Sequence, residues 1–184
     1  MPRESQATLR TAPVRKNMRK TPLDQPVLSA HHSDNEPSEK SVIATVLEAT
    51  KVVDPTTLVA SIKVTKVAVA IDCGGVVVNP NAVEAQMQGG VAYGLSAALW
   101  SQITWTSGKT DQTNFNKYRM AKNGDMPVVS TTIVTPPAGF AGPTGGVGEV
   151  AVPGIAPAVA TAWAKLTGTR IRTLPMFPGQ TMGG

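Results

Sequence analysis

Residues 126–164 form a nearly uncharged stretch in which Glu149 is the single charged residue. Glycines and prolines interrupt this stretch, so it lacks the roughly 18 consecutive apolar residues that a membrane-spanning helix needs. They are densest in residues 136–154, where they make up more than half of the positions. This segment therefore cannot be regular secondary structure, and we expect a turn-rich loop that carries an isolated carboxylate.

Two roles are open for Glu149. A carboxylate among apolar residues either reaches the surface or is desolvated, and desolvation raises a carboxyl pKa toward the range of a general base. The glycines of residues 145–148 can bring backbone N–H groups close to a ligand. Alternatively, the acid only complements the dipole of a following helix, worth about 0.3 to 1 kcal/mol. The glycines fit neither GxxxxGK[ST] nor GxGxxG, so no P-loop or Rossmann site is indicated.

The pattern of β-branched residues and turn residues predicts the strands. Residues from 41 onward form a first strand, Asp54-Pro55 signals a turn, and residues 58–71 form a second strand that completes a hairpin. Ser107-Gly108 lies between runs at residues 103–106 and 109–115 and predicts a second hairpin. Further strands are expected at residues 128–135 and 170–174.

Two helices complete the predicted fold. Asn79-Pro80 is a helix-entry signal, and apolar residues then recur every four positions from Val83 to Leu99. Residues 155–167 predict a second helix that ends before Gly168. Strands and helices in this order indicate an α+β fold with a mixed or antiparallel sheet and two main helices.

Three glycines interrupt the first predicted helix, namely Gly89, Gly90 and Gly94. Each interior glycine costs a helix about 1 kcal/mol relative to alanine, so three within six positions need a physical reason. One reason is the close approach of another backbone or a ligand to a stripe that also includes Gln86 and Tyr93. The other is tight packing of the helix on the sheet with nothing bound. The sequence leaves both open.

The N-terminal region differs from the rest of the chain in charge. Residues 1–20 carry six basic side chains and one acid, which accounts for the whole formal charge of +5. Residues 1–40 have five prolines and no aromatic residue, and we expect a disordered basic leader with solvated His31 and His32. Without aromatic side chains for base stacking, this leader does not indicate nucleic-acid binding. Cys73 is the only cysteine, and a buried structural thiol is the favoured interpretation.

Several segments in one order carry a family resemblance. Together they resemble the C-terminal part of the molybdopterin-binding large subunit of enzymes of the xanthine dehydrogenase and aldehyde oxidase family, and most closely the bacterial isoquinoline 1-oxidoreductase beta subunits. The segments are VAVAIDCG at 67–74, VNPN at 78–81, AQMQGGVAYGLSAAL at 85–99, QTNF at 112–115, GGVGE at 145–149 and APAVA at 156–160. The resemblance covers residues 41–174 and identifies them as a fragment of the second molybdopterin-binding domain, before a flexible tail at 175–184.

The resemblance implies a molybdenum hydroxylase with a molybdopterin cofactor. In that family a Glu that follows a Gly, here Gly148 and Glu149, is the general base that deprotonates the molybdenum-bound hydroxyl before it attacks an aldehyde or N-heterocycle. A Gln that matches Gln86 hydrogen-bonds the pterin. Electrons leave through iron–sulfur clusters of a small subunit or another domain. The chain itself offers no metal ligands of its own, since no CxxC or His-rich cluster is present.

The family's catalytic subunits are several times longer than this chain, and their substrate pocket lies upstream of the matched part. We therefore expect a partner that supplies the upstream region, either within a longer subunit or as a separately encoded chain, and little cofactor binding by the chain alone. The alternative is a non-catalytic scaffold or binding remnant of the domain. With one unpaired cysteine and no membrane span or readable export signal, we expect the protein in the cytoplasm.

Overall fold

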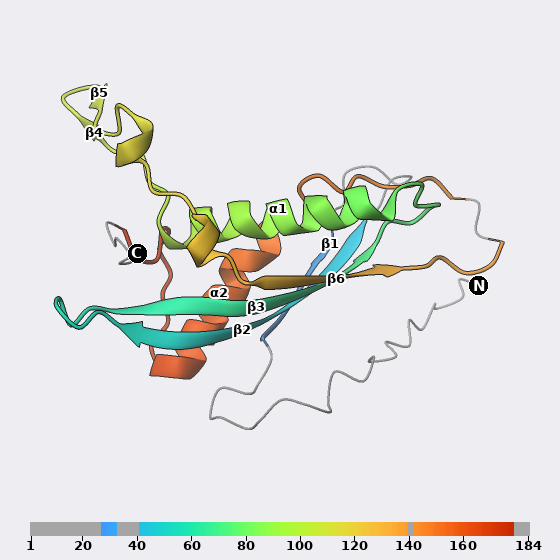
Figure 1. Ribbon diagram of the computed structural model, residues 1–184, viewed down its shortest axis with the longest axis horizontal. Helices are drawn as coiled ribbons and strands as arrows, with labels where there is room; N and C mark the ends of the chain where they lie inside the picture. Colours follow the sequence, from blue (N-terminus) through green and yellow to red (C-terminus); the bar gives the residue numbers. More distant parts are fainter. Residues whose placement is uncertain (1–26, 33–40, 140–141, 179–184) are drawn as a thin grey trace, which may run out of the picture.

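Two long strands form the centre of a four-stranded sheet in the computed structural model, which describes residues 27–32, 41–139 and 142–178 (Figure 1). Strand β2 (Val42–Val53) pairs antiparallel with β3 (Ala60–Asp72), with a β-bulge at Glu48/Ala49. In the turn between them, Asp54 Oδ1 accepts hydrogen bonds from the backbone N–H groups of Thr57 (2.7 Å) and Thr56 (2.8 Å), which lower the pKa of this carboxyl. The predicted hairpin is confirmed.

The two outer strands give the sheet the order β1-β2-β3-β6. Strand β6 (Val128–Val134) runs parallel to β3, and helix α1 (Pro80–Leu99) lies between them in the chain, so β3, α1 and β6 form a β-α-β unit. Strand β1 (Val27–His32) pairs antiparallel with β2. The expectation of a disordered leader over residues 1–40 is therefore wrong for residues 27–32, while residues 1–26 and 33–40 lie outside the described part of the chain.

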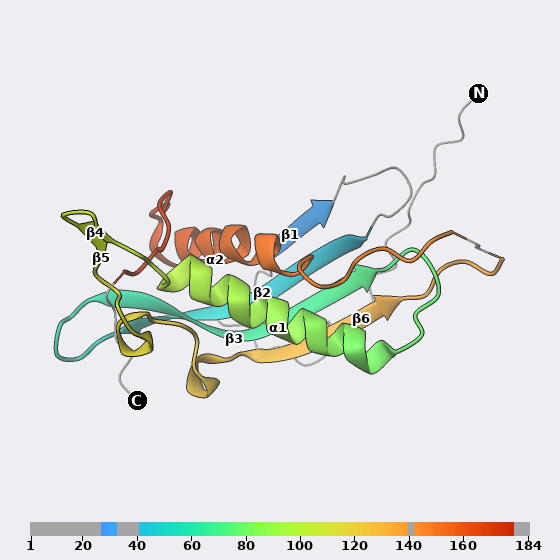
Figure 2. The same ribbon diagram turned by 90° about the horizontal axis from the view of Figure 1, so that it is seen from above.

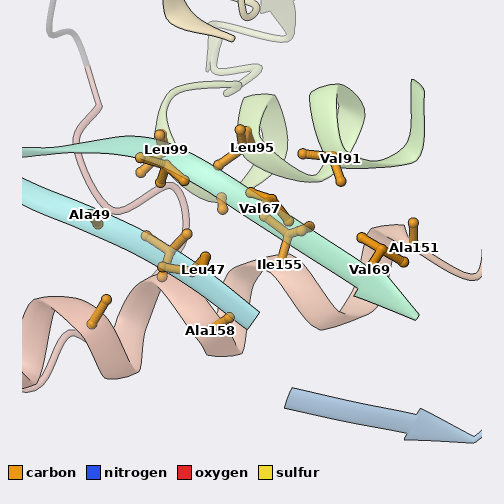
Figure 3. Close-up of a cluster of buried hydrophobic side chains, with 14 of the residues drawn as sticks. Leu47, Ala49, Val67, Val69, Val91, Leu95, Leu99, Ala151, Ile155 and Ala158 are labelled. Carbon is orange, nitrogen blue, oxygen red and sulfur yellow. The ribbon is translucent and has the colours of Figure 1, made fainter. Parts of the chain in front are cut away.

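Both main helices cover the same face of the sheet (Figure 2). Alternate residues of β2 and β3 are buried on this face, and α1 and α2 (Val152–Thr167) pack on them. Figure 3 shows how side chains from both helices and both strands gather in one apolar cluster, which includes Leu47, Val67, Leu95 and Ile155. The sheet is mixed and the two helices are the main ones, so the predicted α+β class is confirmed.

The ends of both helices follow the chemistry that the sequence indicates. At the start of α1, Asn79 Oδ1 accepts a hydrogen bond from the Ala82 backbone N–H (3.2 Å), and Pro80 occupies the first helical position. Helix α2 begins at Val152, three residues before its predicted start. It ends at Gly168, which has the left-handed φ of 74° and donates its N–H to the Ala164 carbonyl (2.8 Å).

The connection between α1 and β6 contains a small hairpin and two 3-10 helices. Strands β4 (Trp105–Thr106) and β5 (Lys109–Thr110) flank Ser107-Gly108 as predicted, but β5 is shorter than the expected run to residue 115. Figure 1 shows this hairpin projecting from the main layers. The 3-10 helices η2 (Phe115–Lys117) and η3 (Asn123–Asp125) follow.

Arg119 ties this connection to the end of α1. Its guanidinium lies 4.3 Å from the centre of the Trp100 ring and forms an ion pair with Asp125 (2.6 Å), and both charged side chains are largely shielded from solvent. The Ser96 hydroxyl accepts a hydrogen bond from the Ala121 N–H (2.9 Å). The polar segment before β6 is therefore held in place although it contains little regular structure.

The C-terminal segment departs from the prediction in two ways. Residues 170–174 form no strand. The segment at 175–177 is buried rather than a flexible tail: the N–H groups of Met176 and Phe177 donate to the carbonyls of Ala98 (2.8 Å) and Leu99 (2.9 Å). Phe177 also meets the edge of Trp163 at a centroid distance of 5.0 Å. Residues 179–184 lie outside the described residues. Among the described helices, none is long and apolar enough to cross a membrane.

We predict that Phe177→Ala lowers the free energy of unfolding by about 3 kcal/mol, because it removes a buried aromatic side chain from its contact with Trp163. The matched control is Leu174→Ala in the same segment, where the side chain is 61% exposed and the expected change is below about 0.5 kcal/mol. Chemical denaturation followed by Trp fluorescence measures both. Equal effects of the two substitutions would contradict the docked segment.

Candidate functional site

The glycines of α1 divide into two groups with different surroundings. An added Cβ at Gly90 would lie 2.8 Å from Ala151 Cβ, and one at Gly94 would lie 2.9 Å from Ile155 Cβ and 3.0 Å from the Val152 carbonyl oxygen. These three distances are too short for a side chain at either position. Gly90 and Gly94 therefore allow the start of α2 to approach α1, which is one of the two reasons that the sequence left open.

Gly89 belongs to the other group. An added Cβ there would meet nothing within 4 Å. The residue lies on an exposed face of α1 together with Gln86 and Tyr93, whose side chains are also exposed, Tyr93 by 62%. No described residue explains why alanine, the better helix former, is absent at position 89.

The Gly-rich loop before α2 is anchored to the end of β3. The Gly145 N–H donates to the Cys73 carbonyl (2.7 Å), and the Thr144 hydroxyl donates to the Val76 carbonyl (3.1 Å). Gly75 faces this loop so closely that an added Cβ would lie 2.5 Å from Thr144 Oγ1. Two glycine-containing segments about 70 residues apart therefore meet through their backbones.

Cys73 is buried at this junction. Burial raises the pKa of its thiol, and the neighbouring Asp72 carboxylate adds to the increase. The Asp72 carboxylate in turn accepts a hydrogen bond from the Gly74 N–H (2.8 Å). The thiol is thus kept protonated, which agrees with the prediction of a buried cysteine.

Glu149 lies on the surface of the described part of the chain. Its backbone carbonyl accepts a hydrogen bond from the Val152 N–H (3.0 Å), which places the residue immediately before α2. Of the two surroundings that the sequence left open for this carboxylate, the described residues give the solvent-exposed one, while Val147 and Val150 beside it are partly buried. The described residues thus leave the carboxylate in contact with solvent.

Gly146 and Gly148 resemble Gly89 in having open space. An added Cβ at either position would meet nothing within 4 Å, and neither residue has the positive φ that favours glycine. Neither internal packing nor backbone conformation requires glycine at these exposed positions. Like Gly89, they present bare backbone toward the outside of the described structure.

The fold places the loop that carries Gly148 and Glu149 between the end of β3 and the middle of α1, the helix that carries Gln86. Gly145 is fixed at Cys73, and Ala151 contacts Gly90, so residues 146–150 run between the end of β3 and the middle of α1. Gln86 is one helical turn before Gly90, about 6 Å along the axis. Glu149 is two residues before Ala151, within about 7 Å along the chain.

Gln86, Gly148 and Glu149 are all exposed in the described structure, unlike the residues of an enclosed active-site pocket. A cleft of about 400 Å³ lies elsewhere, between the last turns of α2 and residues 170–172, and it includes none of the three predicted site residues. The described residues also contain no group of three His, Cys, Asp or Glu that could hold a metal ion. What this surface offers is an exposed carboxamide, an exposed carboxylate and backbone free of side chains.

Comparison with known proteins identifies the domain. A sequence profile described as the molybdopterin cofactor-binding domain matches residues 11–127, which is more than half of the chain. The chain belongs to the molybdopterin cofactor-binding domain family. The resemblance seen in the sequence is thereby confirmed, and the match begins at residue 11, upstream of residue 41 where the resemblance begins. The matched range ends at residue 127, before Gly148 and Glu149.

Similarity to individual proteins supports the assignment to the molybdopterin-binding domain family. The chain is 35% identical over 118 residues to the isoquinoline 1-oxidoreductase subunit beta of Brevundimonas diminuta, an alignment that covers 64% of this chain and 14% of that protein. Two solved structures share its fold. Quinoline 2-oxidoreductase from Pseudomonas putida 86 matches with a TM-score of 0.60 at 24% identity, over 76% of this chain and 17% of that one. Aldehyde oxidoreductase from Desulfovibrio gigas matches with a TM-score of 0.62 at 24% identity, and the match covers 76% of this chain and 15% of that one.

The molybdopterin-binding domain thus spans about one seventh of the length of the curated relative that it matches. The sequence singles out Gln86, Gly148 and Glu149 as candidate site residues, but it does not indicate the contact between Gly75 and Thr144 that positions the loop. The sequence signal for this contact is the pair Gly74-Gly75 after a strand, because glycine there allows another segment to approach the backbone closely. The signal does not say which segment approaches.

We predict opposite effects for alanine at two glycines of α1. Gly94→Ala forces a Cβ against Ile155 and should lower the free energy of unfolding by about 1 to 2 kcal/mol, after the gain in helix propensity is subtracted. Gly89→Ala meets open space and should raise it by about 0.5 to 1 kcal/mol. Urea titrations of both variants test this. Destabilisation by Gly89→Ala would show that position 89 has an internal contact.

Proposed function

We propose that this chain forms one wall of a molybdopterin cofactor site in an oxidoreductase that hydroxylates aldehydes or N-heterocycles. The observation that carries the proposal is the set of exposed glycines at 89, 146 and 148, whose absent side chains nothing in the described structure requires. Gly89 lies about one helical turn after the exposed Gln86, and Gly148 directly precedes the exposed Glu149. The names of the relatives, an isoquinoline, a quinoline and an aldehyde oxidoreductase, support the substrate class.

The residues present fit a pterin on this wall. The Gln86 carboxamide has two donors and one acceptor, which suits the mixed donor and acceptor edge of a pterin ring. Gly148 exposes its backbone without a Cβ, so a ligand can approach to hydrogen-bond distance. When bound, the molybdopterin cofactor supplies the two-electron oxidation that turns a substrate C–H group into C–OH with oxygen from water.

Glu149 acts as the general base in this proposal. Its carboxylate accepts the proton that the oxygen nucleophile gives up as it attacks the electron-poor carbon of the substrate. The carboxylate is exposed in this chain, so the remaining wall must come from outside the described residues and exclude water when it docks. We assign that wall to the upstream part of the large subunit or to a separately encoded equivalent, and the electron acceptor to an iron–sulfur subunit.

A non-catalytic scaffold remnant is the second candidate, and the solvent-exposed Glu149 favours it. The two candidates differ in what the chain does with a partner. An enzyme component should assemble with a longer chain that carries the missing region, whereas a remnant should stay stable, unpartnered and without molybdenum. In either case we expect a cytoplasmic protein, since its one cysteine is buried and unpaired.

The test of the catalytic role is Glu149→Gln in the complex purified with the missing region. We expect hydroxylation to fall by roughly 10² to 10⁴, the usual contribution of a positioned base, at unchanged subunit composition and molybdenum content. Glu84→Gln, which changes another exposed carboxylate near the start of α1, is the control and should leave the rate unchanged. Full activity of the Glu149 variant would remove Glu149 as the base.

Cofactor binding has a separate readout. We expect Gln86→Ala and Gly89→Ala to lower the molybdenum content of the complex, measured by mass spectrometry of metals, while Gly89→Ala leaves the chain itself at least as stable as before. The chain alone should bind molybdenum cofactor weakly or not at all. Stoichiometric molybdenum in the isolated chain would contradict the view that this surface is only one wall of the site.

A further inference from the structure

The outer edge of β6 is an unprotected strand edge. Strand β6 pairs with β3 on one side only, and no described residue hydrogen-bonds to its other side. Its sequence, VVSTTIV, has no charge and no proline, and its pairing with β3 contains no bulge. Proteins that keep such an edge free normally protect it with one of these features, so this edge is suited to pairing with another strand.

The sequence of β6 is complementary to itself in the antiparallel direction. If Thr131 is placed opposite Thr131 of a second copy, Val128 lies opposite Val134, Val129 opposite Ile133, and Ser130 opposite Thr132. Apolar β-branched residues then meet one another, and hydroxyl residues meet hydroxyl residues. Cross-strand pairs of these types stabilise antiparallel sheets.

Prolines restrict the register of such a pair. Pro127 precedes the strand, and Pro136 and Pro137 follow it after one residue. Because proline cannot donate to a strand ladder, pairing can extend only over the residues between them. A shift of two residues in either direction would bring a proline opposite the strand, so the register centred on Thr131 makes the longest ladder.

We propose that two copies of this chain associate through antiparallel pairing of their β6 strands, which joins the two sheets into one sheet of eight strands. The contact of seven residues is small beside the roughly 800 Å² per partner of a stable interface. The association is therefore a concentration-dependent equilibrium between monomer and dimer. It does not depend on the cofactor or on Glu149.

The test exploits the positions that face each other across the two-fold axis. Ser130 and Thr132 are exposed on the open face beside Ala68 and Ala70, so long side chains fit there. In the variant Ser130→Lys with Thr132→Lys, like charges oppose each other twice, and we expect dimerisation at least about tenfold weaker than in the wild type. In the matched variant Ser130→Lys with Thr132→Glu, each Lys opposes a Glu, and the dimer should persist. Sedimentation equilibrium of the full chain over a concentration series measures both.

A mixing experiment keeps the test independent of folding losses. The Lys/Lys variant and a Ser130→Glu with Thr132→Glu variant should each be monomeric alone and should form a one-to-one heterodimer when mixed, as seen by native mass spectrometry. Circular dichroism checks that each variant is folded. A monomeric wild type at all concentrations, open-ended aggregates, or equal behaviour of the Lys/Lys and Lys/Glu variants would overturn the proposal. None of these readouts involves molybdenum, so their failure would leave the proposed function standing.

Discussion

The contact between α1 and the start of α2 is the interaction on which the rest of the structure depends. At Gly90 and Gly94 the two helices approach so closely that a single methyl group would not fit. The contact fixes where α2 begins, and with it the end of the Gly-rich loop whose other end is bound at Cys73. Two glycines in one helix thus set the position of a loop that follows more than 50 residues later in the chain.

Local signals predicted most of the fold. The Asn79 cap, the Asp54 turn, the Gly168 helix end and the alternation in β2 and β3 all work within a few residues, and each has the structure that its chemistry indicates. The failures are long-range. Residues 27–32 gain their strand from pairing with β2, and residues 175–177 gain their order from contacts with α1 and Trp163. Composition describes such segments alone, so it cannot report a partner distant in the sequence.

The sequence singles out the candidate site residues, but it does not indicate their surroundings. Glu149 is conspicuous because the sequence around it is uncharged, yet those neighbours are buried or turned elsewhere and leave the carboxylate exposed. The glycines of α1 had two explanations, and the structure divides them: Gly90 and Gly94 serve packing, while Gly89 has no internal reason to be glycine. A one-dimensional pattern contains both kinds of glycine without distinguishing them, because the distinction lies in which face of the helix is covered.

The hydrogen bonds from Met176 and Phe177 to the carbonyls of Ala98 and Leu99 also bear on how the molecule is made. During synthesis the last turn of α1 leaves the ribosome well before residues 176 and 177 do. Until they emerge, the end of α1 lacks two of its hydrogen-bond partners and Trp163 lacks its aromatic neighbour. The layer formed by the two helices can therefore close only after residues 176 and 177 have been synthesised, and until then a nascent chain exposes this apolar surface.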